Sequence, residues 1–433
     1  MRRVQGGRGL RPVPPLLFCG AGGAEDVRET FLGNGVRVLS ERVPGARSVA
    51  AGVWVGHGAA HDPDALSGRS HLLEHLVFKG TRDRSARDIA LALEGLGGSL
   101  DAWTTREHTS YQARVLDRHL PRALDVLSDL TVNPLLRDED LALEREVVLE
   151  EIAEVEDTPD DLVFELHGEL LWPGSPYGRS ILGTAESVAS MRGDSIRELH
   201  ARVYRGANLL VAAAGNVEHD ALVADAEALW GRVDPGEAEP PAPAPRDGRT
   251  GDERVERDTA QTHVVFGTTL PGHAHPSRYA LSLLSSALGG GMSSRLFQRV
   301  REELALCYSV HTWQTFHAAC GVGGVYLGTR PATAQRAVEA VGEELERVAA
   351  EGLPPDDLAQ VKEQVKGQVV LSLESTAARL YRLAGFALDG EPFLGQDELL
   401  ARVDGVTTEE VAEVAARYVH PDRQLVLRLG PRG

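Results

Sequence analysis

The sequence predicts an α+β protein with two similar halves, each a mixed or antiparallel sheet with helices packed on one face. Strand-like and helix-like segments follow one another without the regular strand–helix alternation of a parallel sheet. The second half repeats the order of the first in outline, and a proline-rich stretch separates them. A chain of 433 residues is long enough for two domains that each bury a core.

The first half is expected to contain short strands and amphipathic helices. Alternating or Val-rich segments indicate the strands, and apolar residues at intervals of three and four indicate the helices. Turn-forming residues mark their ends, such as Gly33–Gly35 inside the first hairpin and Gly97–Gly98 after a helix. We expect strands at 30–39, 48–56, 99–105, 110–115 and 209–216, and helices at 70–80, 86–96, 120–130, 141–155, 195–203 and 221–230.

The second half follows a stretch in which proline recurs at short intervals. This composition favours an extended, semi-stiff linker, which we place at 234–252. The domains are then 27–233 and 253–433, after an Arg-, Gly- and Pro-rich tail at 1–26 that we expect to be disordered. In the second half we expect strands at 262–268, 322–327 and 424–429, and helices at 277–288, 332–350 and 406–419.

Composition argues against several classes of function. Hydrophobic residues make up 42% and charged residues 25% of the chain, as in ordinary globular proteins. The net charge of −19 argues against nucleic-acid binding. No apolar run approaches the roughly 18 residues of a membrane-spanning helix, so we expect no membrane partner. The three cysteines, Cys19, Cys307 and Cys320, form no disulfide framework and suit a reducing compartment.

The segment Ser70–Gly80 carries the most specific chemistry in the chain. His71 and His75 are four residues apart, so both imidazoles leave the same face of the expected helix. Two neutral imidazoles on one face can bind Zn²⁺ at about 2.0–2.1 Å. Glu74 lies beside them, where it could take a proton from a zinc-activated water. The spacing is that of the inverted zinc-protease motif. The alternative is a helix with two unrelated histidines.

A catalytic zinc site usually has a third protein ligand and one open position. The best candidates are Glu144 and Glu151, which are seven residues apart and fall inside the apolar arc of the expected helix at 141–155. Burying a lone carboxylate is costly, so an inward-facing pair needs a cation or hydrogen-bond donors. The alternatives are that the helix ends expose both carboxylates, or that an arginine pairs with them.

On these residues the chain resembles peptidase family M16, the pitrilysin family of zinc metallopeptidases, in the branch of the mitochondrial processing peptidase and its bacterial relatives. That family has His-x-x-Glu-His and then a distal Glu on a second helix, at the spacing that separates His75 from Glu151. The resemblance implies one Zn²⁺ per chain, with His71, His75 and Glu151 as ligands. It implies Glu74 as general base and Glu144 as a further acidic residue that supports catalysis.

Two further segments resemble substrate-contacting parts of the family. The third expected strand matches the edge strand that pairs with the substrate backbone, which implies contacts by Ala102 and Thr104. The usual pattern there has Asn, where this chain has Asp101. Arg301 and Tyr308 match a pair in the second half that, in relatives, holds the substrate backbone and polarises the tetrahedral intermediate. The alternatives are an interior strand, a solvated Arg and a core Tyr.

The resemblance implies a zinc endopeptidase that cleaves unfolded peptides in a chamber closed by two chains. We expect a homodimer, because the metal motif and the Arg301–Tyr308 pair coexist in one chain, although a heterodimer with a related chain stays open. The fold would be the duplicated α+β unit of the family, and the location the bacterial cytoplasm. Three alternatives remain: a dedicated maturation peptidase for one ribosomally made peptide, a non-catalytic scaffold subunit, and a small-molecule lyase that shares the motif and core fold.

Overall fold

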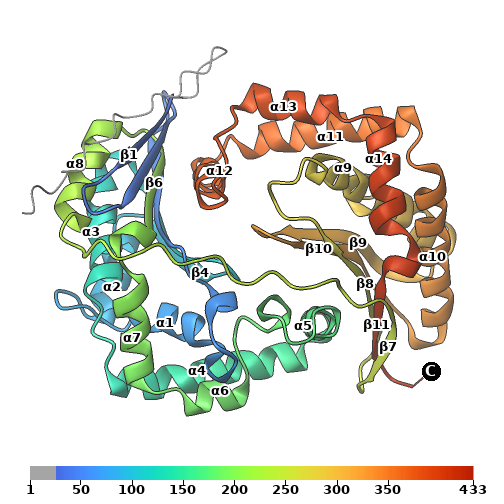
Figure 1. Ribbon diagram of the computed structural model, residues 1–433, viewed down its shortest axis with the longest axis horizontal. Helices are drawn as coiled ribbons and strands as arrows, with labels where there is room; N and C mark the ends of the chain where they lie inside the picture. Colours follow the sequence, from blue (N-terminus) through green and yellow to red (C-terminus); the bar gives the residue numbers. More distant parts are fainter. Residues whose placement is uncertain (1–25, 433) are drawn as a thin grey trace, which may run out of the picture.

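Residues 26–432 are described by the computed structural model, and they form two sheets with their helices (Figure 1). The first sheet has six strands: β1 (Asp26–Phe31), β2 (Arg37–Arg42), β3 (Ser48–Val55), β4 (Ser99–Thr104), β5 (Thr109–Leu116) and β6 (Leu209–Gly215). Their order is β1–β2–β6–β3–β5–β4. β2 and β6 are parallel, and the other neighbours are antiparallel. β4 therefore forms an edge of this sheet.

The second sheet has five strands: β7 (Gly251–Glu256), β8 (Thr262–Leu270), β9 (Cys307–Phe316), β10 (Gly321–Thr329) and β11 (Leu425–Gly430). Their order is β7–β11–β8–β10–β9, with β7 and β11 parallel and the other neighbours antiparallel. β9 forms an edge here, as β4 does in the first sheet. Both sheets are thus mixed, as the sequence predicts.

Each half of the chain contributes its own set of helices, most of which lie between strands in the sequence. Those of the first half are α1 (Arg69–Val77), α2 (Ala86–Glu94), α3 (Leu120–Val132), α4 (Asp138–Asp157), α5 (Pro159–Leu171), α6 (Ala185–Ser190), α7 (Gly193–Val203) and α8 (His219–Trp230). Those of the second half are α9 (Arg278–Gly289), α10 (Ala334–Glu351), α11 (Pro355–Ser372), α12 (Thr376–Leu388), α13 (Gln396–Gly405) and α14 (Thr408–Val414). Proline starts α5 and α11, where its missing N–H costs no helical hydrogen bond.

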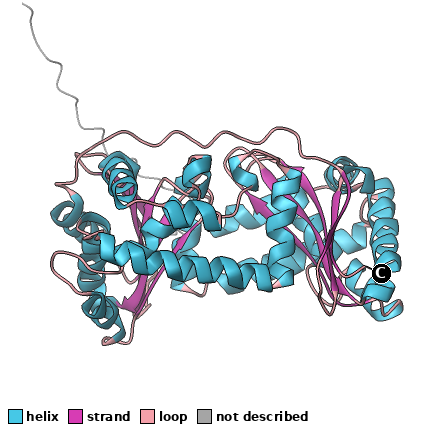
Figure 2. Ribbon diagram, turned by 90° about the horizontal axis from the view of Figure 1, so that it is seen from below, coloured by secondary structure: helices cyan, strands magenta, loops and turns pink. Residues whose placement is uncertain are grey.

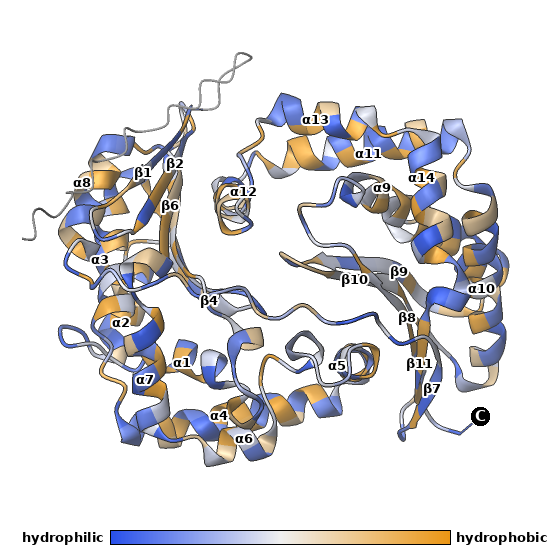
Figure 3. Ribbon diagram, in the orientation of Figure 1, coloured by the Kyte–Doolittle hydropathy of each residue, from blue (hydrophilic) through white to orange (hydrophobic). Residues whose placement is uncertain are grey.

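Each sheet buries a hydrophobic core under helices of its own half. In the first half, side chains of α1, α3 and α8 pack with the strands into one cluster. In the second half, α9, α10 and α14 do the same. Figure 3 shows hydrophobic colouring on the central strand β6 and on the helix faces turned toward the sheets. Each Å² of apolar surface that is buried contributes about 25 cal/mol of stabilisation, so these two clusters are the main source of stability.

The other face of each sheet is covered by one helix from the opposite half. α5 lies against β8 and β11 of the second sheet, where His167 Nε2 is 3.1 Å from the carbonyl oxygen of Leu425. α12 lies against β6, β3 and β2 of the first sheet, and its Leu380 and Leu383 are buried there. Figure 1 shows α12, in the orange of the second half, beside the first sheet. The two halves therefore share their cores rather than merely touching.

Buried polar contacts fix α12 on the first sheet. Glu41 on β2 is fully buried and pairs with Arg379 of α12. At the end of the helix, Arg37 Nη1 donates to the carbonyl oxygen of Ala387 at 2.6 Å. A buried carboxylate left without a partner would cost several kcal/mol, so these contacts favour one position of the helix.

The predicted fold class is confirmed, and most predicted elements form within a few residues of the expected bounds. The helix expected at 406–419 is divided, because α14 continues as a π-helical turn at Ala415–Val419. The sequence reasoning missed β7, β9, α5, α6, α11, α12 and α13. The linker runs along the outside between the halves (Figure 2) and ends at residue 250, where β7 begins.

The predicted tail at 1–26 falls almost entirely outside the described residues, apart from Asp26 at the start of β1. Within residues 26–432, no helix is long and apolar enough to cross a membrane.

Candidate metal centre

The metal-motif helix α1 is held at its start by a buried carboxylate. Asp62 Oδ2 accepts a hydrogen bond from the backbone N–H of Ser70, and its Oδ1 accepts one from the Ser70 hydroxyl, both at 2.9 Å. Gly68 precedes the helix with φ of 84°, and a Cβ there would lie 2.3 Å from the carbonyl oxygen of Leu182. Glycine is therefore required at this turn. These contacts fix the first turn of α1, which contains His71.

His71, His75 and Glu151 converge on one point. One ligand atom from each lies within 4.8 Å of the other two. Glu151 Oε2 is 3.8 Å from His71 Nε2, and Glu151 Oε1 is 3.7 Å from His75 Nε2. These separations are too long for hydrogen bonds. They approach the spacing of about 3.3 Å between donors bound tetrahedrally at about 2.0–2.1 Å. The three side chains therefore fit a zinc ion.

The protonation state of His71 also suits a metal ligand. Burial, and then the neighbouring imidazole of His75, lower the pKa of His71 to about 4. His71 is therefore neutral near pH 7, which is the form that binds metal. Its Nδ1 is buried and has no hydrogen-bond partner among the described residues.

Glu144 lies behind His75 rather than beside Glu151. Its Oε2 is 3.1 Å from His75 Nδ1, and its Oε1 is 2.5 Å from the ammonium nitrogen of Lys79. Glu144 is buried, so the lysine compensates its charge. A carboxylate that accepts a hydrogen bond from Nδ1 fixes the tautomer in which Nε2 offers its lone pair to the metal. The structure thus separates the two carboxylates that the sequence left as joint candidates.

Glu74 projects from the same helix toward the edge strand. The hydroxyl of Thr104 donates to Glu74 Oε2 at 2.6 Å. Burial raises the pKa of Glu74, and the Thr104 hydrogen bond and the His75 imidazole act in the opposite direction. A carboxyl group whose pKa is raised toward neutrality can both accept and return a proton. Glu74 is therefore held by Thr104 beside the two histidines, with its pKa above the ordinary carboxyl value.

β4 presents free main-chain groups close to Glu74. Thr105 N donates to the carbonyl oxygen of His108 at 2.8 Å, which fixes the alternation of the antiparallel ladder between β4 and β5. In such a ladder every second residue turns its N–H and C=O away from the partner strand. Ala102 and Thr104 are in that set, and no other strand of the described chain pairs with this edge, although the main-chain N–H of Thr104 also donates to Glu74. The Thr104 side chain itself is engaged by Glu74.

Arg301 and Tyr308 lie together in the second half. The guanidinium carbon of Arg301 is 5.4 Å from the centre of the Tyr308 ring and 4.4 Å from that of Phe297. Tyr308 is 79% exposed near the start of the edge strand β9. No interaction among the described residues joins this pair to the three metal-site residues.

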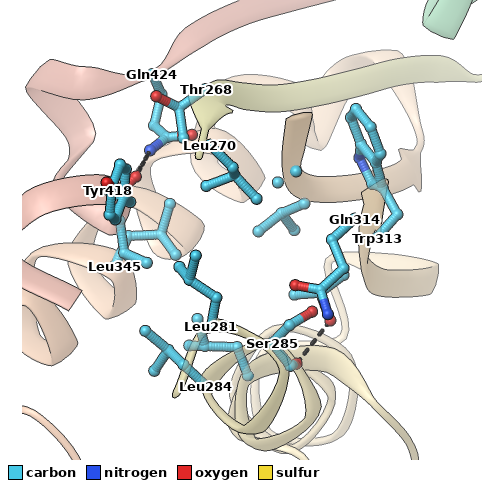
Figure 4. A pocket seen from close by; sticks show the side chains of 16 residues that line it. Thr268, Leu270, Leu281, Leu284, Ser285, Trp313, Gln314, Leu345, Tyr418 and Gln424 are labelled. Carbon is cyan, nitrogen blue, oxygen red and sulfur yellow. Dashed lines mark hydrogen bonds between the residues drawn. The ribbon is translucent and has the colours of Figure 1, made fainter. Parts of the chain in front are cut away.

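Sequence reasoning missed the residues that support this site. Lys79 follows His75 by four positions, in the turn just after α1, so its spacing could have suggested a contact with a carboxylate facing His75. Asp62 gave no comparable signal, because it acts across a loop. A pocket of about 50 Å³ lies elsewhere, between the second sheet and α9, and none of the metal-site residues line it (Figure 4).

Comparison with known proteins places this geometry in a family. The family model described as insulinase (peptidase family M16) matches residues 37–185, and the model of the peptidase M16 inactive domain matches residues 190–365. An uncharacterized zinc protease of Streptomyces coelicolor is 40% identical over 96% of this chain and 92% of its own length. The chain belongs to peptidase family M16. Among other relatives, the uncharacterized zinc protease YmxG of Bacillus subtilis is 37% identical over 92% of this chain and 97% of its own.

Two solved structures share the fold. A peptidase M16 inactive domain from Pseudomonas fluorescens superposes with a TM-score of 0.88, covering 94% of this chain and 98% of its own. A protease from Helicobacter pylori superposes with a TM-score of 0.87, covering 94% and 100%. Both are 20% identical, so this likeness concerns the fold alone. Family membership and the names of the sequence relatives support a zinc protease in general.

Proposed function

We propose that this M16 protein is a zinc endopeptidase that cleaves unfolded peptides, with one Zn²⁺ held by His71, His75 and Glu151. The observation that carries the proposal is the convergence of these three side chains, with Glu74 on the helix that bears the two histidines. When bound there, zinc would polarise the peptide carbonyl and lower the pKa of the attacking water. The remaining steps follow from the side chains of this chain.

Glu74 would take the proton of the attacking water and pass it to the leaving amine. The hydrogen bond from Thr104 supports this role because it holds the carboxyl group in place. The raised pKa of Glu74 supports it because a carboxyl group with a higher pKa accepts a proton more readily. Glu144 would act as a positioning residue through His75 Nδ1.

The peptide would add a strand to the free edge of β4. Main-chain hydrogen bonds with Ala102 and Thr104 would hold it extended, and this recognition does not depend on the side chains of the substrate. An extended strand cannot be supplied by a segment already paired in a folded protein, which supports a preference for unfolded peptides.

We further propose that two copies of the chain assemble, with Arg301 and Tyr308 of one copy facing the metal site of the other. Two observations support a contribution in trans: the high exposure of Tyr308, and the absence of contacts between this pair and the metal-site residues within the described chain. A heterodimer with a related M16 chain would satisfy the same observations. The proposed location is the bacterial cytoplasm.

The decisive experiment changes Glu74 to Gln, which keeps its size and removes its proton chemistry. Zinc content should stay at the wild-type level, while cleavage of an unstructured fluorogenic peptide should fall by roughly 10²–10⁴-fold. Glu146→Gln, an exposed change on α4, is the matched control and should leave the rate unchanged. Cleavage by the Glu74 variant at the wild-type rate would contradict the mechanism.

A further inference from the structure

Side chains of the edge strand β4 alternate between two very different surroundings. Thr104 points to Glu74 on the metal side of the sheet. Asp101 and Trp103 are each an odd number of positions away, so they lie on the opposite face. Trp103 meets Tyr381 of α12 there, with 5.2 Å between ring centres. That face therefore brings residues of the first half next to a helix of the second half.

This face is only partly covered. α12 packs on β6, β3 and β2, and beyond them it reaches β4 through Tyr381, which stays 42% exposed. Asp101 is exposed as well. Gln112, which stands opposite Asp101 on β5, is buried, and its Nε2 has no hydrogen-bond partner within residues 26–432. We name Asp101, Trp103 and Tyr381 the acidic–aromatic patch.

The patch carries an uncompensated negative charge next to aromatic rings. No described residue forms an ion pair or a hydrogen bond with the Asp101 carboxylate. Burial, and then the Asp101 carboxylate, raise the pKa of the Tyr381 phenol, so the two groups are electrostatically coupled. A carboxylate beside exposed aromatic faces attracts a cation through an ion pair and a cation–π contact. Arginine suits such a site better than lysine, because its planar group stacks and donates at once.

We propose that the acidic–aromatic patch is a specificity subsite that selects an arginine side chain of a peptide paired with β4. The proposal rests on the proposed peptidase function. A peptide strand added to the β4 edge continues the alternation of the sheet, so every second side chain lies on the α12 side. One of these side chains then lies beside Asp101.

The test compares arginine with citrulline, its neutral isostere. A set of unstructured fluorogenic peptides carries one arginine, moved through the four positions on each side of the scissile bond, and each peptide has a citrulline twin. The measured quantity is the ratio of kcat/KM between the twins. For the zinc-loaded wild-type protein we expect a ratio of roughly 5- to 20-fold, the range of a partly exposed ion pair plus a cation–π contact. It should appear only at alternate positions.

Three variants locate the preference. Asp101→Asn, an isosteric change of an exposed side chain, should lower the ratio by roughly 2- to 5-fold, because the ion pair is lost and only the cation–π contact remains. Tyr381→Leu should lower it, whereas Tyr381→Phe should keep it, because the ring remains. Glu346→Gln on α10 removes the same charge from another exposed position and should leave the ratio unchanged.

Two results would overturn the subsite. If wild type cleaves the peptides with a ratio near one at every position, the patch does not select arginine, and the peptidase function stands. If Asp101→Asn keeps the full arginine preference, another residue recognises the cation. A third result, no cleavage of any peptide by zinc-loaded protein, would overturn the peptidase function and the subsite with it.

Discussion

His75 is the residue at which the contacts of the metal site meet. Its Nε2 faces Glu151, its Nδ1 faces Glu144, and its ring lies 4.6 Å from that of His71 between centres. In the proposed zinc site, the contact with Glu151 would place His75 as a ligand, the contact with Glu144 would orient it, and the contact with His71 would bring in the other imidazole. Because the three contacts have different roles, substitutions of the residues around His75 should have distinguishable effects on zinc binding and on peptide cleavage.

Loss of a ligand should reduce zinc content directly. We predict that His71→Ala and Glu151→Ala each lower the zinc bound by purified protein well below one ion per chain, because two protein donors hold zinc weakly. Metal analysis after dialysis measures this. His275→Ala removes an exposed histidine and is the control. Full zinc content in both site variants would refute the assignment of ligands.

Loss of the orienting carboxylate should act differently. Glu144→Gln is predicted to lower zinc affinity or peptide cleavage by roughly 10- to 100-fold, the usual effect of a residue behind a metal ligand. Cleavage should suffer more than zinc content, because His75 itself remains. The check is a zinc titration beside a kcat measurement, with Glu146→Gln as the exposed control on the same helix. If the Glu144 variant loses zinc and the Glu151 variant keeps it, the two roles must be exchanged.

At this scale the sequence could predict what spacing determines. A spacing of four positions puts His71 and His75 on one helix face, and the position of Glu151 in an apolar arc indicates that it points inward. Spacing could not tell that Thr104 holds Glu74, because that contact joins a strand to a helix 30 residues away in the chain. The sequence predicts only a substrate contact for Thr104, whereas its hydroxyl donates a hydrogen bond to Glu74.

At the scale of elements, local sequence patterns could not predict that α5 and α12 each pack on the sheet of the opposite half. An apolar stripe shows that a helix packs on something, but it does not show which sheet the helix meets. α12 lies next to its own sheet in sequence and buries Leu380 and Leu383 against the other one. The edge strand β9 was missed for a related reason, because an edge strand buries one face only in part and alternates weakly.

A residue of the second half should therefore stabilise the first. We predict that Leu383→Ala lowers the free energy of unfolding by roughly 2–5 kcal/mol, because it opens a cavity between α12 and the first sheet. Amides of β6 should lose protection from hydrogen exchange in the same variant. Leu371→Ala, an exposed leucine on α11, is the control and should change stability by less than about 0.5 kcal/mol. Loss of protection confined to the second half would contradict the shared core.

At the scale of the whole molecule, each half has an edge strand that lies near a set of polar groups. β4 and the metal site belong to the first half, and β9 with Tyr308 belongs to the second. The cores shared through α5 and α12 oppose any rearrangement that would bring the two sets together within one chain. A second copy related by two-fold symmetry is the simplest way to supply the missing set, and such dimers are the commonest oligomers.

The proposed dimer makes a complementation experiment possible. The Glu74→Gln protein and the Arg301→Ala/Tyr308→Phe protein should each be nearly inactive alone. In a mixed dimer with sites shared in trans, one site carries both defects and the other carries neither, so each mixed dimer should regain at most about half of wild-type activity. Mass spectrometry of intact complexes verifies that subunits have exchanged. No recovery despite exchange would mean that Arg301 and Tyr308 act in cis or not at all. A fully active monomer by light scattering would exclude the dimer.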